Sequence, residues 1–285
     1  MERINHLTIS TIQPIATPTL NRINNTFSNL RRAGKKALIP YLTPDFPFKG
    51  STVPLLRSVS AAGADLIEVG IPFSDPLADG KTIQHSSEVA LRNGANLASI
   101  LTSLREFRTS SEVPVLLMGY LNPLLRFGLE KFTVAAVAAG VDGVIIPDLP
   151  PEESGSLVES CKTAGLSNVF LIAPTTNDER IRLIDTFSTD FSYCVSVTGV
   201  TGARSSLGTN GSSDAFFQRV RRETKKPFVV GFGVSSRDHV ADIWRHADGA
   251  VVGSALIDRI GRAKSIDEAA TAAASFLNSI RPDHA

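Results

Sequence analysis

Eight short apolar runs recur between residues 37 and 253, and they constrain the fold more than any other feature of the chain. Each run is continuous and rich in Val, Ile and Leu, as expected for parallel strands that are buried on both faces. Longer stretches with helical periodicity separate them. The runs are ALIPYL (37–42), DLIEVG (65–70), PVLLMG (114–119), DGVIIP (142–147), NVFLIA (168–173), FSYCVSV (191–197), PFVVG (227–231) and GAVVG (249–253).

The joins between helices and strands repeat along the chain. AAGADLIEVG (61–70) is similar to AAGVDGVIIP (138–147), and HADGAVVGS (246–254) is a weaker copy. Gly63 and Gly140 are placed to end their helices, and the Asp that follows opens the next strand. Eight such strand–helix units predict an α/β fold, a single (β/α)8 (TIM) barrel, in preference to an open doubly wound sheet.

The chain is expected to form one domain. Residues 22–285 would make up the barrel, with an extra helix before the first strand, and residues 1–21 a flexible extension. Two helical segments, 82–92 and 96–108, are predicted between the second and third strands. The first twenty residues lack the apolar core of a secretory signal. We favour a flexible bacterial extension. Because the segment has few acidic residues and several hydroxyl side chains, an organelle transit peptide is the alternative.

Composition narrows the class of protein. Lys and Arg total 29 against 28 Asp and Glu, so the net charge of +1 gives no indication of a nucleic-acid partner. Cys161 and Cys194 lack the spacing of a zinc site, and two separate cysteines fit a reducing compartment, so a cytoplasmic location is expected. No apolar run approaches the roughly 18 residues needed to span a membrane.

The glycine-rich segments after the last two runs suggest a phosphate site. In such barrels the active site lies at the C-terminal ends of the strands, and the loops after strands seven and eight often bind phosphate. Backbone N–H groups there could face an anion, because small residues precede a helix start in both segments. The alternative is that the glycines merely end the strands. The residues concerned are Gly231, Gly233, Ser235, Gly253 and Ser254.

Carboxylates are the candidates for proton transfer, since none of the five histidines falls at the predicted C-terminal end of a strand. Glu68 lies within the second run, where strand alternation turns it away from Ile67 and Val69 and into the barrel. Burial there would raise its pKa toward neutrality, which suits a group that both gives and takes a proton. Asp79 on the following loop can approach the same mouth. A structural acid at Glu68 and a turn residue at Asp79 are the alternatives.

These segments together resemble the α subunit of tryptophan synthase over about residues 22–281. The resemblance is carried by LIPYLT, IEVGIPFSDPLADGKTIQ, VDGVIIPDLPPEES, SVTGVTGAR, VVGFGVSS and VVGSALI, which occur in the family's order. It implies an eight-stranded barrel that cleaves indole-3-glycerol phosphate to indole and glyceraldehyde 3-phosphate by a retro-aldol reaction, without a cofactor or metal. It also implies a partner, a β subunit that uses pyridoxal phosphate to join indole to serine, in an α2β2 assembly.

The same resemblance assigns roles to residues. Glu68 would be the catalytic acid and base, and Asp79 would hydrogen-bond the indole N–H and stabilise positive charge on the ring. Asp75 would belong to the surface for the β subunit. The long Gly-, Ser- and Thr-rich loop 198–211 would close as a lid. The residues implied for substrate binding are Tyr41, Tyr193, Thr201, Gly202, Phe232, Gly233, Ser235, Gly253 and Ser254.

Two adjacent residues depart from the family pattern. Pro44 and Asp45 follow Thr43, where a small residue and a glycine would be expected. If the Asp45 carboxylate pointed into the barrel it would weaken binding of an anionic substrate, whereas an outward carboxylate would be harmless.

Three other functions remain as alternatives to the lyase subunit. One is a catalytically weak or silent α homologue that mainly activates a β subunit, against which the retention of both carboxylates argues. Another is a stand-alone lyase that releases indole. The third is a different phosphosugar barrel enzyme, which would explain the phosphate loops but not the acidic loop after the second strand.

Overall fold

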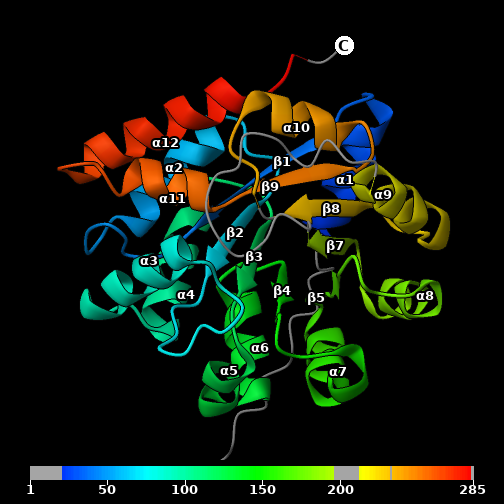
Figure 1. Ribbon diagram of the computed structural model, residues 1–285. Coiled ribbons are helices and arrows are strands. Elements are labelled where there is room, and N and C mark those ends of the chain that lie inside the picture. Colours follow the sequence, from blue (N-terminus) through cyan, green and yellow to red (C-terminus); the bar gives the residue numbers. More distant parts are fainter. Residues whose placement is uncertain (1–20, 196–211, 232, 284–285) are drawn as a thin grey trace, which may run out of the picture.

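The computed structural model describes residues 21–195, 212–231 and 233–283. Its short strands lie at the centre and its helices surround them (Figure 1). Neighbouring strands pair in parallel, and each of the eight predicted runs contributes to the sheet. The strands are β1 (Ala37–Leu42), β2 (Ile67–Gly70), β3 (Val115–Met118), β4 (Gly143–Ile145), β5 (Ser167–Val169), β6 (Leu171–Ile172), β7 (Ser192–Val195), β8 (Phe228–Gly231) and β9 (Gly249–Val252).

The strand order closes into a barrel. It runs β5-β4-β3-β2-β1-β9-β8-β7-β6, and its two ends are fragments of one predicted strand, 168–173. The fragments are separated by Phe170, whose backbone N–H donates to the Ser188 hydroxyl at 3.2 Å while its carbonyl accepts from the Tyr193 N–H at 3.1 Å. The predicted strand therefore divides, because its first half pairs with β4 and its second half with β7. The fold is the predicted (β/α)8 barrel.

Helices follow the strands as a parallel barrel requires. The predicted pair between the second and third strands is present, and Asn96 caps the second of them by accepting the Ser99 N–H. None of the described helices is both long and apolar enough to cross a bilayer. The helices are α1 (Arg22–Arg32), α2 (Thr52–Ala61), α3 (Lys81–Arg92), α4 (Leu97–Arg108), α5 (Leu121–Phe127), α6 (Leu129–Ala138), α7 (Gly155–Ala164), α8 (Asp178–Phe187), α9 (Ser212–Glu223), α10 (Arg237–Trp244), α11 (Ser254–Ile260) and α12 (Ile266–Ile280), with a 3₁₀ turn at Pro151–Glu153.

Alternation along the strands divides the apolar side chains into two clusters. The cluster inside the barrel includes Ile39, Leu116 and Val229, and Ile23 and Phe27 of α1 join it. The extra N-terminal helix therefore helps to fill the interior. The second cluster lies between the strands and the outer helices, and it includes Ile67, Val69, Leu101, Val230 and Leu256.

An aspartate at the start of three strands fixes the register with the preceding strand. Asp142 donates its backbone N–H to the Val115 carbonyl at 2.8 Å, and its carboxylate accepts the Val115 N–H at 2.8 Å. The same two-way bond joins Asp65 to Leu38, at 3.0 and 2.8 Å. It recurs between Asp248 and Phe228, at 2.9 and 3.1 Å. The repeated Gly–X–Asp and Ala–Asp segments of the sequence therefore indicate where these paired backbone and carboxylate hydrogen bonds form.

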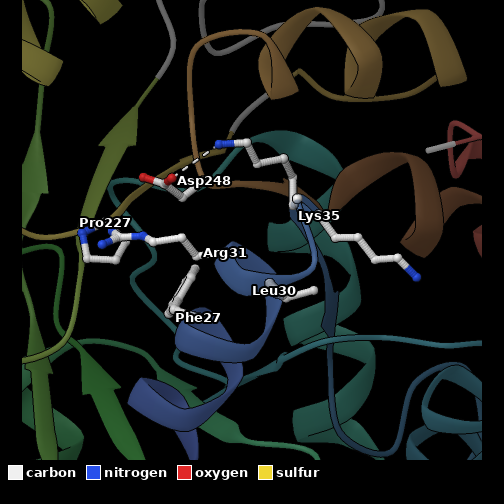
Figure 2. A pocket seen from close by; sticks show the side chains of 8 residues that line it. Phe27, Leu30, Arg31, Lys35, Pro227 and Asp248 are labelled. Atoms are coloured by element: carbon white, nitrogen blue, oxygen red, sulfur yellow. Dashed lines mark hydrogen bonds and ion pairs between the residues drawn. The ribbon is translucent and has the colours of Figure 1, made fainter. Parts of the chain in front are cut away.

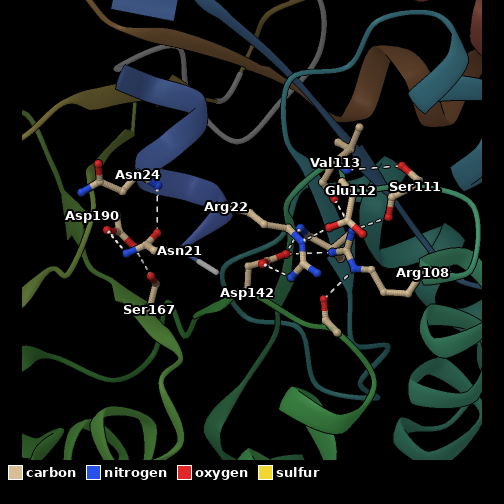
Figure 3. A network of polar contacts seen from close by, with 12 residues as sticks. Asn21, Arg22, Asn24, Arg108, Ser111, Glu112, Val113, Asp142, Ser167 and Asp190 are labelled. Carbon is tan, nitrogen blue, oxygen red and sulfur yellow. Dashed lines mark hydrogen bonds and ion pairs between the residues drawn. The ribbon is translucent and has the colours of Figure 1, made fainter. Parts of the chain in front are cut away.

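Charged partners neutralise these aspartates and tie α1 to the strand starts. Asp142 accepts Arg22 at 3.1 Å and Arg108 at 2.7 Å, while Arg22 also pairs with Glu112 (Figure 3). Beside this group Asn21 donates to Asp190 at 2.9 Å. Because these bonds lie at the N-terminal ends of the strands, they hold α1 at the end of the barrel opposite the predicted site.

Candidate active site

Glu68 lies inside the barrel, as strand alternation predicts. Its neighbours Ile67 and Val69 pack in the outer cluster, and Glu68 is paired in register with Tyr41 of β1 and Leu116 of β3. The side chain is 1% exposed, and neither carboxylate oxygen has a hydrogen-bond partner among the described residues. This burial raises the pKa of Glu68 to about 8, so the carboxyl is largely protonated at neutral pH.

Two buried tyrosines lie around this carboxyl, and each needs a glycine beside it. A Cβ added at Gly70 would lie 2.0 Å from the Tyr41 hydroxyl oxygen, and one added at Gly231 would lie 1.8 Å from that of Tyr193. Burial raises the pKa of Tyr193 well above its usual value, and Glu68 adds to the effect. Burial, Asp79 and Glu68 together raise the pKa of Tyr41. The Glu68 carboxyl therefore raises the pKa of both phenols.

Asp79 lies on the loop between β2 and α3 and is half-buried. Burial raises its pKa to about 6, and the Tyr120 hydroxyl acts in the opposite direction. Because Tyr41 responds electrostatically to both Glu68 and Asp79, the structure brings the two predicted carboxylates to the same end of the barrel. One is held mainly protonated and the other mainly ionised at neutral pH, which is the division of roles expected of an acid and a charge-stabilising group.

Two residues that support the Asp79 loop were missed by the sequence reasoning. The Tyr120 hydroxyl accepts the Ala78 N–H at 2.9 Å, and the Gln84 side-chain amide donates to the Asp79 carbonyl at 2.8 Å. Tyr120 directly follows the third apolar run and its terminal glycine. The rule that places functional residues at the C-terminal ends of strands could therefore have found it.

The predicted phosphate residues lie on neighbouring strand ends. β8 ends at Gly231 and pairs with β9, after which Gly253 precedes α11. Gly233 has a φ of +82°, and the Ser235 hydroxyl lies 3.3 Å from Nδ1 of His239 in the first turn of α10. The structure thus brings both glycine-containing segments together, each followed by a helix.

Some predicted residues lie outside the described part of the chain. They are Thr201, Gly202 and Phe232, together with the loop 198–211 and residues 1–20 of the predicted extension.

Asp45 turns away from the barrel. Its φ of +52° places it in the left-handed region, which explains why a glycine is expected here and why an Asp can replace it. The carboxylate accepts the Gly50 N–H at 2.9 Å and the Thr52 hydroxyl at 3.0 Å. Both partners belong to its own loop and the start of α2. The Asp45 carboxylate is therefore bound within its loop and points outward, and it does not point into the barrel.

Replacing Asp45 by alanine is expected to lower the free energy of unfolding by about 1 to 2 kcal/mol, because two hydrogen bonds are lost and alanine is strained at positive φ. Urea unfolding followed by circular dichroism measures the change. Asp45→Gly is the matched control, since it removes the same bonds and relieves the backbone. An alanine variant as stable as the glycine variant would contradict the strained conformation.

A cavity of about 120 Å³ lies at the other end of the barrel (Figure 2). Phe27 and Leu30 of α1 line it, together with Lys36, Pro227 and Asp248, which precede β1, β8 and β9. Lys36 and Asp248 are themselves paired at 3.2 Å. The cavity therefore belongs to the N-terminal face and is separate from the carboxylate site. Within the described ranges, no three His, Cys, Asp or Glu side chains are grouped to hold a metal ion.

Comparison with known proteins gives a consistent result. The family model described as tryptophan synthase alpha chain matches residues 27–282. The tryptophan synthase alpha chain of Chlorobium luteolum is 47% identical over 257 residues, covering 88% of this chain and 95% of its own. That of Roseiflexus castenholzii is 48% identical over 263 residues, covering 92% and 100%.

Solved structures agree with the sequence matches. Tryptophan synthase subunit alpha from Legionella pneumophila superposes with a TM-score of 0.84 at 37% identity, over 92% of this chain and 97% of its own. A chain of the tryptophan synthase α2β2 complex from Pyrococcus furiosus superposes with a TM-score of 0.80 at 42% identity, over 86% and 97%. Fold, carboxylate site and matched length together show that the chain belongs to the tryptophan synthase alpha chain family.

Proposed function

We propose that this chain is the lyase subunit of tryptophan synthase and cleaves indole-3-glycerol phosphate to indole and glyceraldehyde 3-phosphate. The observation that carries the proposal is Glu68, a buried carboxyl inside the barrel with its pKa raised to about 8. A purely structural acid would be expected to have hydrogen-bond partners in such a place, and the described residues supply none.

The proposed reaction begins with Glu68 as an acid. The protonated carboxyl gives its proton to the indole carbon that bears the glycerol side chain, and the ring becomes an electron sink. The Glu68 carboxylate then takes the proton of the adjacent glycerol hydroxyl as the carbon–carbon bond breaks. Indole and the aldehyde are released, and Glu68 is again protonated. The proton balance therefore closes on one residue, and no cofactor is required by this chemistry.

The role proposed for Asp79 is electrostatic. Its carboxylate accepts a hydrogen bond from the indole N–H and stabilises the positive charge that develops when the ring is protonated. Its pKa of about 6 supports this role, since the group is ionised for the most part at neutral pH. Tyr41 and Tyr193 would form the wall of the indole pocket around Glu68.

We place the substrate phosphate at the ends of β8 and β9. The residues proposed to bind it through backbone N–H groups and hydroxyls are Gly202, Gly233, Ser235, Gly253 and Ser254, with Phe232 beside the indole and Thr201 contacting Asp79 from the lid loop. Remote binding of this kind supplies energy that positions the reacting atoms.

A β subunit is the proposed partner, in an α2β2 assembly like that of the Pyrococcus furiosus relative. Asp75 is exposed on the loop after β2, and the neighbouring Leu77 is 94% exposed. We propose that Asp75 and Leu77 belong to the surface that the β subunit covers. We further propose a cytoplasmic location, in keeping with the two free thiols of Cys161 and Cys194.

Steady-state release of indole from indole-3-glycerol phosphate, with and without the β subunit, tests the function. We expect cleavage that rises when the β subunit is added, and Asp79→Asn is expected to lower kcat/KM by roughly 10²-fold. Equal turnover with and without the β subunit would instead support a stand-alone lyase. No cleavage under either condition, with the β subunit still activated, would identify a silent homologue.

A further inference from the structure

Tyr120 lies on the segment after β3 and contacts the loop after β2, and its neighbour Leu121 bonds to the loop after β4. It comes just after β3, at the residue that precedes α5, and its side chain is 5% exposed. Its ring packs against that of Phe73, on the loop after β2, with the ring centres 5.5 Å apart. The first N–H of α5, that of Leu121, donates to the two carboxylate oxygens of Asp148, at 3.0 and 3.3 Å. Asp148 lies on the loop after β4, so the position of Tyr120 is fixed from both sides.

The Tyr120 hydroxyl acts on two adjacent residues of the acidic loop, Ala78 and Asp79. Its oxygen accepts the Ala78 N–H at 2.9 Å. Since that contact uses the oxygen as an acceptor, the single hydroxyl proton is left available for the Asp79 carboxylate, whose pKa the Tyr120 hydroxyl lowers. One hydroxyl therefore holds the backbone before Asp79 and also stabilises the charged form of the Asp79 carboxylate.

We propose that Tyr120 is a positioning residue for the cleavage reaction, whose hydroxyl holds the loop after β2 and aims the Asp79 carboxylate before substrate binds. The inference rests on the proposed function, because it concerns how the charge-stabilising group of that site is oriented. A preorganised carboxylate costs no reorganisation when the ring becomes positive, and for this reason its support matters to the rate.

The hydroxyl also acts on the ionisation of Asp79. Burial raises the pKa of Asp79 to about 6, and the Tyr120 hydroxyl opposes that rise by stabilising the charged form. Without the hydroxyl the pKa should move further up, leaving less Asp79 ionised at neutral pH. The other titratable groups that act on this pair are Tyr41 on β1 and Asp148 on the loop after β4. Asp75 and Lys81, close to Asp79 in the sequence, are exposed.

Tyr120→Phe tests the proposal because it removes the hydroxyl and keeps the ring that packs on Phe73. Three measurements are made on the full chain. Carbon-13 NMR of aspartate side-chain carboxyls gives the pKa of Asp79, and hydrogen exchange gives the protection of the Ala78 amide. The pH dependence of kcat/KM for indole-3-glycerol phosphate, with the β subunit present, gives the effect on cleavage.

We expect the variant to show an Asp79 pKa above that of the parent chain and an Ala78 amide that exchanges about fivefold faster, the factor for one net hydrogen bond. The acidic limb of the pH profile of kcat/KM should shift to higher pH. Near pH 7 we expect kcat/KM to fall about tenfold, mainly because kcat falls. Gln84→Ala is the matched control, since it releases the Asp79 carbonyl without touching the carboxylate. It should loosen the loop and leave the pKa of Asp79 in place.

An unchanged Asp79 pKa in Tyr120→Phe, or the same upward shift in Gln84→Ala, would overturn the inference. The two NMR and exchange measurements need no substrate. They therefore decide the role of Tyr120 even if the parent chain fails to cleave indole-3-glycerol phosphate, a result that would count against the proposed function instead.

Discussion

Replacing Glu68 by glutamine is expected to abolish cleavage of indole-3-glycerol phosphate while leaving the barrel folded. Glutamine has nearly the same volume, so the buried position of Glu68 keeps its packing, but the amide can neither give nor take the proton. General acid–base catalysis typically contributes roughly 10²- to 10⁴-fold, and we expect a loss of at least this size in kcat. Indole release measured with the β subunit present gives the rate.

Activation of the β subunit provides the control for folding in this experiment. The Glu68→Gln chain should raise the rate at which the β subunit joins indole to serine as well as the parent chain does. A variant that retains a near-normal cleavage rate would remove Glu68 from the acid–base role. A variant that fails in both assays would have lost its structure, and circular dichroism would show it.

The same substitution is expected to change how stability depends on pH. The folded-state pKa of Glu68 is about 8, whereas an ordinary glutamate titrates near 4.5. Between these values the unfolded chain has released the proton and the folded chain still holds it, so the free energy of unfolding falls as pH rises, by about 1.4 kcal/mol per unit. Glu68→Gln removes this dependence.

The advantage of the glutamine variant over the parent should therefore grow from pH 5 to pH 8, by on the order of 3 kcal/mol. Urea unfolding of both chains at several pH values measures it. Glu130→Gln, which removes an exposed carboxylate from α6, gives the background to subtract. A difference between Glu68→Gln and the parent that stays constant across this range would show that burial does not hold the Glu68 proton.

Local patterns in the sequence were sufficient to predict the barrel and the direction of Glu68. Apolar runs of five to seven residues indicate burial on both faces, and alternation within one of them assigns Glu68 to the side opposite Ile67. The break at Phe170 could not be predicted in this way. It depends on the Ser188 hydroxyl, which reaches the Phe170 N–H from a different segment.

The support of Asp79 illustrates the same limit at the active site. The Asp–Gly pair predicts a turn, and the family motif assigns a role to the carboxylate, but the pattern carries no information on what holds it. The hydroxyl of Tyr120 comes from 41 residues further along the chain and meets the loop only because β2 and β3 are neighbours. Asp45 shows the reverse case, since its partners lie within seven residues of it, on its own loop and at the start of α2.

The aspartates at the starts of β2, β4 and β9 have a consequence for the order in which the barrel can fold. Each two-way bond joins strands that are consecutive in the chain, and its carboxylate bonds to a residue only 20 to 27 positions away. Loops of that length close at small entropic cost, so each strand–helix–strand module can fix its own register before the ring is complete. A circular permutation that opens the chain between these modules would leave all three registers encoded, because none of the three bonds crosses such a cut.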